Sequence, residues 1–220
     1  MKRLALLSAL LITGLSDVTS AHADTAEQRG LFVFQHVCSS CHGMSQAHYG
    51  DMAALNPSLP ALEEWSKQRH ADLNSPIASP YPNEAVGKAA NGGDFPPDLS
   101  HIARTIKGGP SYIETMLHSY TAPPPGVVLA PHTYYNPVAL THHHRFKMRP
   151  PLQDHMLSYP DGTEATTAQM AHDVTAFLVW SDDAHKASRT LIGSCVIAYL
   201  LIMLGLILWF KRLIWQRKPH

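Results

Sequence analysis

The chain has 220 residues, with 17 Lys or Arg and 17 Asp or Glu, so its formal net charge is zero with histidine neutral. The zero hides an asymmetry. Residues 24–189 contain 11 basic and 16 acidic residues, a net charge of −5, whereas the two ends of the chain are basic. Nothing in this distribution suggests a nucleic-acid-binding protein. An acidic central region suits recruitment of a basic partner, and it serves solubility equally well.

The first 23 residues have the three parts of a secretory signal peptide. Lys2-Arg3 is a basic start, residues 4–15 form a short apolar run, and Ala21-His22-Ala23 is a small-x-small cleavage site. The apolar run is too short to span a bilayer comfortably. We therefore predict cleavage after Ala23, which leaves Asp24 at the new amino terminus and exports residues 24–189.

The most specific motif follows the first predicted helix. Thr25-Ala26-Glu27-Gln28 is a capping box that opens this helix. Cys38-Ser39-Ser40-Cys41-His42 then has the C-x-x-C-H pattern of c-type haem attachment, in which two thiols add to the haem vinyl groups and His42 binds the iron. A redox C-x-x-C pair or half of a zinc site are alternatives. The first lacks a surrounding βαβ pattern, and the second lacks another ligand pair, because Cys195 lies in an apolar run.

The rest of the exported part alternates between short helices and proline-rich loops. Asp98 can cap a short helix through Ile106, and Ser111-Tyr112-Ile113-Glu114 has the form of a second capping box. From Thr121 to Pro151, repeated prolines prevent a regular helix. Thr166 begins a final helix with one apolar side. We therefore expect an all-α fold with a long, irregular loop.

A haem iron in an electron carrier usually has a second axial ligand opposite the histidine. Met44 follows His42 too closely to cross to the other haem face, and Met116 and Met170 fit helical core positions. Met148 lies just before Pro150-Pro151, where a stiff loop can hold a thioether against iron with little loss of entropy. From this chemistry alone Met148 is a candidate, and the other methionines and the histidines stay open.

A second membrane signal lies near the carboxyl end. Residues 190–210 contain no charged side chain and are long enough, at about 1.5 Å per residue, to cross a hydrocarbon core of about 30 Å. Lys211 and Arg212 follow at once, and the positive-inside rule places residues 211–220 in the cytoplasm. A buried core helix is the alternative, but such helices rarely run so long without a polar side.

Taken in order, many short segments resemble the cytochrome c1 family, whose members are haem subunits of the cytochrome bc1 complex. The resemblance covers nearly all of residues 24–220, including the apolar segment near the carboxyl end. Its segments are Arg29-Gly30, Cys38–His42, Tyr81–Glu84, Ala89–Gly92, Pro96–Ser100, Gly108-Gly109 with Tyr112, Pro124–Val127, Tyr134–Pro137, Met148 with Pro150–Leu152, Asp161–Thr163, Ala165-Thr166, Gln169–Ala171 and Asp173-Val174.

The resemblance implies a fold like that of class I cytochromes c, with long irregular loops and one carboxyl-terminal transmembrane helix. It implies one covalently bound haem c whose iron is bound by His42 and Met148. It also implies that Asn91, Pro97 and Tyr112 lie near the haem, with Tyr112 near a propionate. A Met/His ligand pair raises the haem potential relative to two nitrogen ligands, which suits a late electron carrier.

The function implied is single-electron transfer within a quinol–cytochrome c reductase. The chain would accept an electron from the Rieske iron–sulfur subunit and pass it to a cytochrome c, beside cytochrome b in the bacterial inner membrane. Its haem domain would lie in the periplasm, and quinol oxidation would belong to other subunits. The alternatives are another membrane-anchored monohaem cytochrome serving an oxidase or dehydrogenase, a haem peroxidase with an open sixth site, and a metal-binding module.

Two segments depart from the family pattern. An arginine that pairs with a haem propionate is expected where this chain has Ile106, which leaves Arg104 or Lys107 as the partner, or no partner at all. The run His142-His143-His144 replaces an apolar, glycine-rich approach to Met148. We favour exposed loop residues for this run over a metal site, because adjacent residues rarely converge on one ion.

Overall fold

The computed structural model describes residues 24–216 except 56, 140–143 and 184–185. Its elements are α1 (Ala26–His36), η1 (Cys38–Ser40), β1 (Met44–His48), η2 (Tyr49–Leu55), α2 (Leu59–Gln68), β2 (Pro76–Ile77), α3 (Glu84–Ala90), α4 (Ile102–Thr105), α5 (Gly109–His118), β3 (Tyr134–Tyr135), β4 (Arg145–Phe146), α6 (Thr167–Asp182) and α7 (Lys186–Gln216). The described part is mostly helical, as expected. The two small antiparallel sheets, β1 with β2 and β3 with β4, were not predicted.

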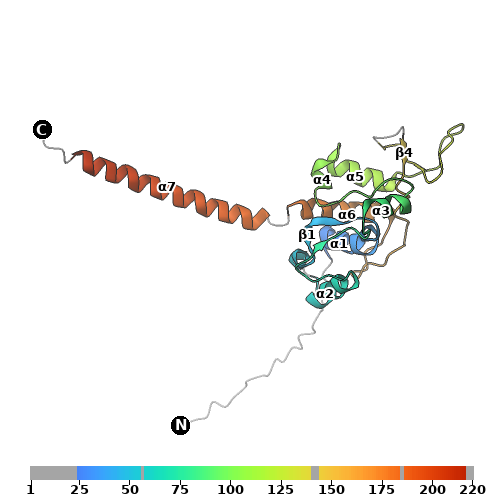
Figure 1. The fold of residues 1–220 in the computed structure, drawn as a ribbon, viewed down its shortest axis with the longest axis horizontal. Coiled ribbons are helices and arrows are strands. Elements are labelled where there is room, and N and C mark those ends of the chain that lie inside the picture. Colours follow the sequence, from blue (N-terminus) through green and yellow to red (C-terminus); the bar gives the residue numbers. More distant parts are fainter. Residues whose placement is uncertain (1–23, 56, 140–143, 184–185, 217–220) are drawn as a thin grey trace, which may run out of the picture.

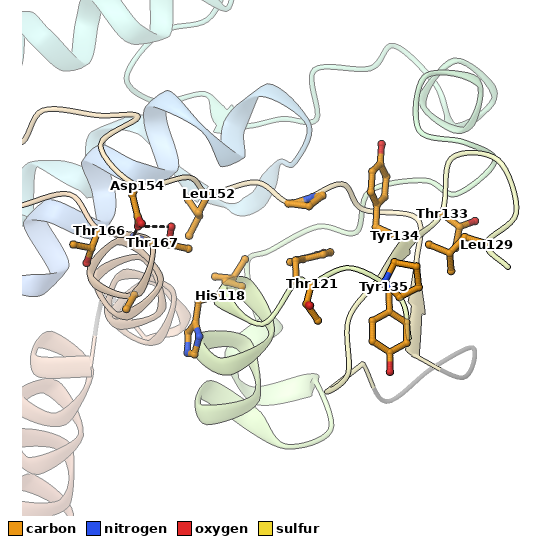
Figure 2. A pocket seen from close by; sticks show the side chains of 15 residues that line it. His118, Thr121, Leu129, Thr133, Tyr134, Tyr135, Leu152, Asp154, Thr166 and Thr167 are labelled. Carbon is orange, nitrogen blue, oxygen red and sulfur yellow. Dashed lines mark hydrogen bonds between the residues drawn. The ribbon is translucent and has the colours of Figure 1, made fainter. Parts of the chain in front are cut away.

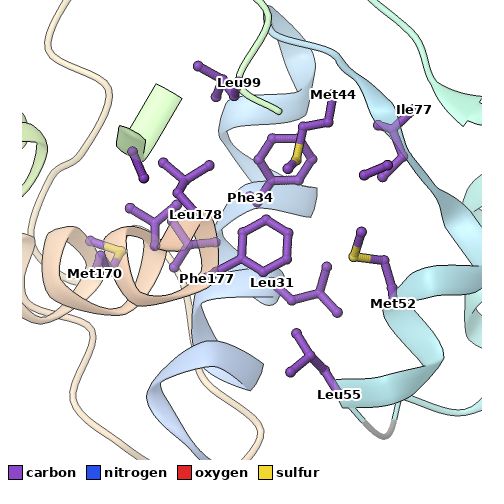
Figure 3. Close-up of a cluster of buried hydrophobic side chains, with 14 of the residues drawn as sticks. Leu31, Phe34, Met44, Met52, Leu55, Ile77, Leu99, Met170, Phe177 and Leu178 are labelled. Carbon is purple, nitrogen blue, oxygen red and sulfur yellow. The ribbon is translucent and has the colours of Figure 1, made fainter. Parts of the chain in front are cut away.

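Helix α6 is the centre of the domain, since it packs against α1 and against the α4–α5 pair (Figure 1). Phe34 of α1 and Phe177 of α6 are fully buried, and their ring centroids are 5.4 Å apart. Figure 3 shows these two rings facing each other within the apolar core. Trp65 of α2 closes this core, with its ring 6.3 Å from that of Phe34 in an edge-to-face arrangement.

Gly30 allows α1 to approach α6 this closely. A Cβ atom at Gly30 would lie 2.0 Å from the carbonyl oxygen of Asp173 and 2.6 Å from Cβ of Phe177. The nearest atom belongs to the backbone, so it cannot move aside cheaply. Any larger residue at this position must therefore push α1 away from α6. The segment that follows α1 would move with it.

The capping signals predicted two of the helix starts correctly. Thr25 forms a complete capping box with Gln28 at the start of α1, and the Thr166 side chain accepts from Gln169 at the start of α6. Both caps act within four residues, so they require no tertiary context. The predicted proline-rich loop is also confirmed, because residues 121–139 contain only the short strand β3.

The other two predicted caps are wrong. Helix α5 begins at Gly109, not at Ser111, because Gly108 has a left-handed conformation (φ +92°) and Pro110 suits the first turn of a helix. Helix α4 begins after His101, and the Asp98 carboxylate instead accepts from the backbone N–H of Ser45, in a neighbouring segment, and from that of Ser100, two residues further along.

Helix α7 projects from the domain (Figure 1). Residues 189–215 are long and apolar enough to cross a membrane, and none of the most apolar window is buried in the protein. A buried core helix is therefore excluded for this segment, and α7 is the membrane anchor. Helix α7 is longer than the predicted crossing segment of residues 190–210, because its first turn includes Lys186 and Arg189.

We predict that Gly30→Ala destabilises the domain by about 1–3 kcal/mol, the usual cost of overpacking a core. Urea unfolding of the detergent-solubilised protein, followed by helical circular dichroism, measures this change. Gln35→Ala, a half-buried position on the same helix, is the control. Equal stability of the Gly30→Ala variant and the wild type would contradict the close approach of α1 and α6.

Candidate functional site

The two thiols of the C-x-x-C-H motif lie on one turn that continues from α1. The backbone N–H groups of Cys41 and His42 both donate to the carbonyl of Cys38, over 3.1 and 2.9 Å. Cys38 and Cys41 are free thiols and are half-buried. Burial raises the pKa of the Cys38 thiol to about 12, so this sulfur is protonated at neutral pH. The turn therefore presents two unoxidised sulfurs that can each form a thioether.

The imidazole of His42 is fixed by a residue far away in the sequence. Its Nδ1 lies 2.8 Å from the carbonyl oxygen of Pro97. A carbonyl oxygen can only accept, so Nδ1 carries the proton and Nε2 has the lone pair for a metal. Burial lowers the pKa of His42 and outweighs the opposing effects of the Pro97 carbonyl and Asp98. The ring is therefore neutral at pH 7, as a metal ligand must be.

A short ladder of hydrogen bonds holds the Pro97 carbonyl in place. The N–H of Leu99 donates to the carbonyl of Gly43 over 2.9 Å, and the N–H of Ser45 donates to Asp98 Oδ2 over 2.7 Å. Asp98 thus accepts a hydrogen bond from a backbone N–H group in this ladder, whereas we had expected it to accept one at the start of a helix. The segment directly after Pro97 is thereby tied to the segment directly after His42.

Close packing on the other side of Gly43 completes this support. A Cβ atom at Gly43 would lie 2.5 Å from the backbone nitrogen of Ser79 and 2.8 Å from the carbonyl carbon of Ala78. Only glycine fits between the two backbones without displacing one of them. The position of His42 therefore depends on a residue type that the haem motif itself does not include.

Asn91, which the resemblance placed near the haem, lies at the end of α3, and its role toward the haem stays a prediction. It caps the end of α3, and its side-chain amide donates to the carbonyl of Gly87 over 2.7 Å. The Tyr81 side chain lies within interaction range of both Asn91 and Cys41, and the charge of Arg149 also acts on it. Sequence reasoning assigned no role to Tyr81, although it lies in one of the segments that match the family pattern.

Met148 lies in a segment that is tied to α5. The Tyr120 hydroxyl donates to the carbonyl oxygen of Met148 over 3.1 Å, and the rings of Tyr120 and Phe146 meet edge to face at 6.5 Å. Phe146 is in β4 and pairs with Tyr134 of β3. The following residue, Arg149, acts on Tyr81, which is beside Cys41. These contacts bring the Met148 segment to the side of the domain that carries the thiols.

Asn136 is a second support of this loop and was not singled out from the sequence. It is fully buried, and its side-chain amide donates to the carbonyl of Met116 over 2.8 Å. Its backbone N–H donates to the carbonyl of His144, and its side-chain oxygen accepts from Val138. Asn136 therefore connects α5 with both sides of the loop that precedes Met148. A polar residue between two tyrosines and a proline was the only local signal.

These arrangements agree with comparisons to known proteins. The model of the cytochrome C1 family matches residues 15–218. Cytochrome c1 of Rhodospirillum rubrum is 34% identical over 224 residues, covering 88% of this chain and 82% of that protein. A mitochondrial cytochrome c1 heme protein of Kluyveromyces lactis is 36% identical, covering 86% of this chain and 69% of its own length. A protein of Bradyrhizobium diazoefficiens named cytochrome b/c1 is 33% identical, and 33% of its length is covered.

The chain belongs to the cytochrome c1 family. A covalently bound haem c, electron transport and a membrane anchor are characteristic of cytochrome c1 proteins. The haem motif on one helical turn and the apolar helix α7 are the features of this chain that correspond to them.

Tyr112, which the cytochrome c1 resemblance had placed near the haem, lies on α5, and Arg104, one candidate for the propionate partner, lies on α4. Tyr112 of α5 is half-buried, packs over Gly108, and acts electrostatically on Tyr120, close to the Met148 segment. Arg104 of α4 is exposed and lies 3.3 Å from Asp182 of α6 in an ion pair. This pair gives Arg104 a protein partner, and its role toward a propionate stays a prediction.

The histidine run lies mostly outside the described residues, which include only His144. This residue has a left-handed conformation (φ +67°), and its ring is 6.2 Å from that of Tyr135. Among the residues described, no three His, Cys, Asp or Glu side chains form a group that could hold a metal ion. The metal-binding alternative therefore has no support from the described part of this loop.

A cavity beside the proline-rich loop is separate from the thiols. It has a volume of about 740 Å³ and lies between the end of α5, the start of α6 and the proline-rich loop (Figure 2). Tyr120, Tyr134 and Leu152 line it, whereas neither cysteine nor His42 does. The Thr167 hydroxyl donates to Asp154 over 2.8 Å at one wall, as Figure 2 shows. The cavity therefore borders the loop that contains Met148 but does not include the C-x-x-C-H motif.

We predict that Asn136→Ala destabilises the domain by about 1–3 kcal/mol, because the variant loses the buried side-chain amide that donates to the Met116 carbonyl and accepts from the Val138 N–H. Urea unfolding measures the loss, and limited proteolysis locates it in residues 121–150. Asn74→Ala removes an exposed asparagine and should change stability by less than about 0.5 kcal/mol. If the two variants unfold alike, Asn136 does not support the loop.

Proposed function

We propose that this cytochrome c1 is the electron-transfer subunit of a cytochrome bc1 complex and carries one haem c on Cys38 and Cys41. The observation that carries this proposal is the hydrogen bond from His42 Nδ1 to the Pro97 carbonyl, directly after a turn that carries both Cys38 and Cys41. It leaves Nε2 as the nitrogen for iron and fixes the plane of the imidazole ring. A redox-active dithiol would have no need of a histidine held in this way.

The residues present fit a haem group in their chemistry. Two thiols can form thioethers, a neutral imidazole nitrogen is available at His42, and Met148 offers a thioether from a loop held by Tyr120. Once bound, haem supplies one-electron redox chemistry at its iron. The protein would supply the orientation of His42 and Met148. Asn91, Pro97 and Tyr112 are assigned to the surroundings of the haem.

Support for Met148 as the second axial ligand comes from its backbone. The Tyr120 hydroxyl fixes its carbonyl, and Asn136 fixes the loop before it. A thioether on a held loop loses little conformational freedom when it binds, which favours ligation over a mobile side chain. The same support opposes a peroxidase with an open sixth site, because such an enzyme would not need a methionine held here.

The partners that we propose are cytochrome b, the Rieske iron–sulfur subunit and a cytochrome c. The Rieske subunit would give this chain one electron, and the chain would pass it to the cytochrome c. The name cytochrome b/c1 of the Bradyrhizobium relative supports an association with cytochrome b. Another membrane-anchored monohaem cytochrome remains the alternative that a search for partners separates from this one.

The proposed topology has four parts. Residues 1–23 are the cleaved signal peptide, and residues 24–189 are the periplasmic haem domain in a bacterial inner membrane. Residues 190–210 cross the membrane, and residues 211–220 are a basic cytoplasmic tail. The apolar surface of α7 supports the crossing, and Lys211 and Arg212 support the orientation.

We predict that Met148→Leu keeps the covalent haem but loses the sulfur-to-iron charge-transfer band of the oxidised protein. The midpoint potential should fall by on the order of 0.1 V, part of the roughly 0.8 V over which axial ligands shift haem potentials. Met156→Leu is the matched control, since Met156 Sδ lies 3.3 Å from the backbone nitrogen of Gln153 and has its own place. An unchanged spectrum in the Met148→Leu variant would exclude this residue as the ligand.

Partner identification tests the function itself. The full chain, tagged at its carboxyl end, should copurify from native membranes with a cytochrome b and a Rieske protein. The purified assembly should reduce cytochrome c when quinol is added. Copurification with an oxidase or a periplasmic dehydrogenase instead would favour the alternative cytochrome.

A further inference from the structure

A buried ion network joins the start of α1 to α6 and to the turn at Asp161. The Arg29 guanidinium donates from Nε and Nη2 to the two carboxylate oxygens of Asp173, over 2.9 and 3.0 Å. Its Nη1 lies 3.4 Å from Oδ2 of Asp161. The carboxylates of Asp173 and Asp161 are 0% and 2% exposed. Two buried carboxylates therefore share one guanidinium.

The charges of this network do not balance. Arg29 forms a bidentate pair with Asp173, and the longer contact to Asp161 is secondary. Burial raises the pKa of Asp161, but hydrogen bonds from Thr163 and from the Asp24 N–H, with the charge of Arg29, outweigh burial and hold it below its ordinary value. Asp161 is therefore ionised at neutral pH, and one negative charge is left over.

Both polar groups of the Asp24 backbone form hydrogen bonds with this network, one with Asp161 and one with Arg29. Its nitrogen donates to Oδ2 of Asp161 over 3.1 Å, and its carbonyl oxygen accepts from Nη1 of Arg29. Asp24 comes directly before Thr25, the cap of α1, so it has little freedom to leave. The nitrogen of Asp24 therefore lies at the carboxylate whose charge is not balanced.

This nitrogen is also the one that the predicted processing step would release. Ala21-His22-Ala23 is a cleavage site by sequence, and Asp24 follows it. We propose that cleavage after Ala23 turns the Asp24 amide into an α-ammonium that forms an ion pair with Asp161 and completes the network. Hydrolysis leaves the new carboxylate on Ala23 and the amine on Asp24, and this amine takes up a proton from water at neutral pH. The proposal does not depend on the electron-transfer function.

Processing would in this way strengthen the packing of α1 on α6. Before cleavage, Asp161 faces a neutral N–H. Afterwards it faces a full positive charge at the same place, and a charge-assisted hydrogen bond is stronger than a neutral one. Because α1 leads directly to the turn of Cys38 and Cys41, the mature amino terminus helps to hold the segment that carries the thiols.

The ion pair should make the stability of the mature domain depend on pH. The direction of this dependence follows from the groups around the Asp24 nitrogen. Those groups are the Asp24 side chain, Arg29 on α1, Gln169 and Asp173 on α6, and Tyr159, Asp161 and Thr163 in the turn. Burial raises the pKa of Tyr159, and the hydrogen bond to Asp173 raises that of Arg29, so neither changes charge near pH 8. Of these groups, the α-ammonium of Asp24 is therefore the one that titrates near pH 8.

An α-amino group has an ordinary pKa of about 7.7–8.0, and pairing with Asp161 raises it in the folded state. The stabilisation is then fully present below pH of about 7.7 and is lost as the pH rises through the folded pKa. The uncleaved chain, whose Asp24 nitrogen is an amide, has no such step.

The test uses the full mature protein purified in detergent. Mass spectrometry should find Asp24 as the amino terminus. Acylation of this amine by a water-soluble anhydride, followed at different pH values, should give a pKa raised by about one unit or more. A variant with two alanines inserted between Ala23 and Asp24 keeps the cleavage site after Ala23. Where mass spectrometry finds the first inserted alanine as its amino terminus, the ammonium is two residues further from Asp161, so its amine should have the ordinary pKa.

Two carboxylate variants complete the test. Asp161→Asn should return the pKa of the amine to its ordinary value, whereas Asp94→Asn, at an exposed site, should not change it. If Asp161→Asn fails to accumulate, the two-alanine variant still decides the question. An amino terminus other than Asp24, or equal pKa values in the wild type and the two-alanine variant, would overturn the proposal.

Discussion

The hydrogen bond between His42 Nδ1 and the Pro97 carbonyl is the interaction on which the candidate site depends. It joins residues that are 55 positions apart and determines which ring nitrogen is left for iron. Its acceptor is a backbone atom, so its strength depends on where the chain runs rather than on a particular side chain. For this reason the orientation of His42 also depends on the surrounding ladder, in which the Leu99 N–H donates to the Gly43 carbonyl and the Ser45 N–H donates to Asp98.

The rest of the fold positions the two ends of this interaction. Gly30 brings α1 against α6, and α1 leads into the turn of the thiols. Arg29, the residue before Gly30, donates to both carboxylate oxygens of Asp173, so both contacts hold the first half of α1 on α6. The loop with Met148 is attached independently, through Tyr120 and the β3–β4 pair. The thiol turn and the Met148 loop are thus held by different contacts, and a substitution that weakens one set need not disturb the other.

Sequence reasoning succeeded where the signal was local. The caps at Thr25 and Thr166 follow from a few consecutive residues, and the apolar helix α7 follows from one uninterrupted apolar run. It was wrong about Asp98, because this side chain is used by a segment more than 50 residues away, which no local pattern reveals. It had no means of giving Asn136 a role, since its partners belong to α5 and to the far side of the loop. The resemblance to the cytochrome c1 family supplied the long-range information that residue patterns lack.

The central claim is that this chain holds a haem through the two thiols of one turn. Peptide mass spectrometry of the full chain, purified from native membranes, tests it directly. The account predicts that the peptide containing Cys38 and Cys41 is heavier by one haem and that neither thiol reacts with an alkylating reagent, whereas Cys195 does. A peptide of unmodified mass with two alkylated thiols would contradict the account.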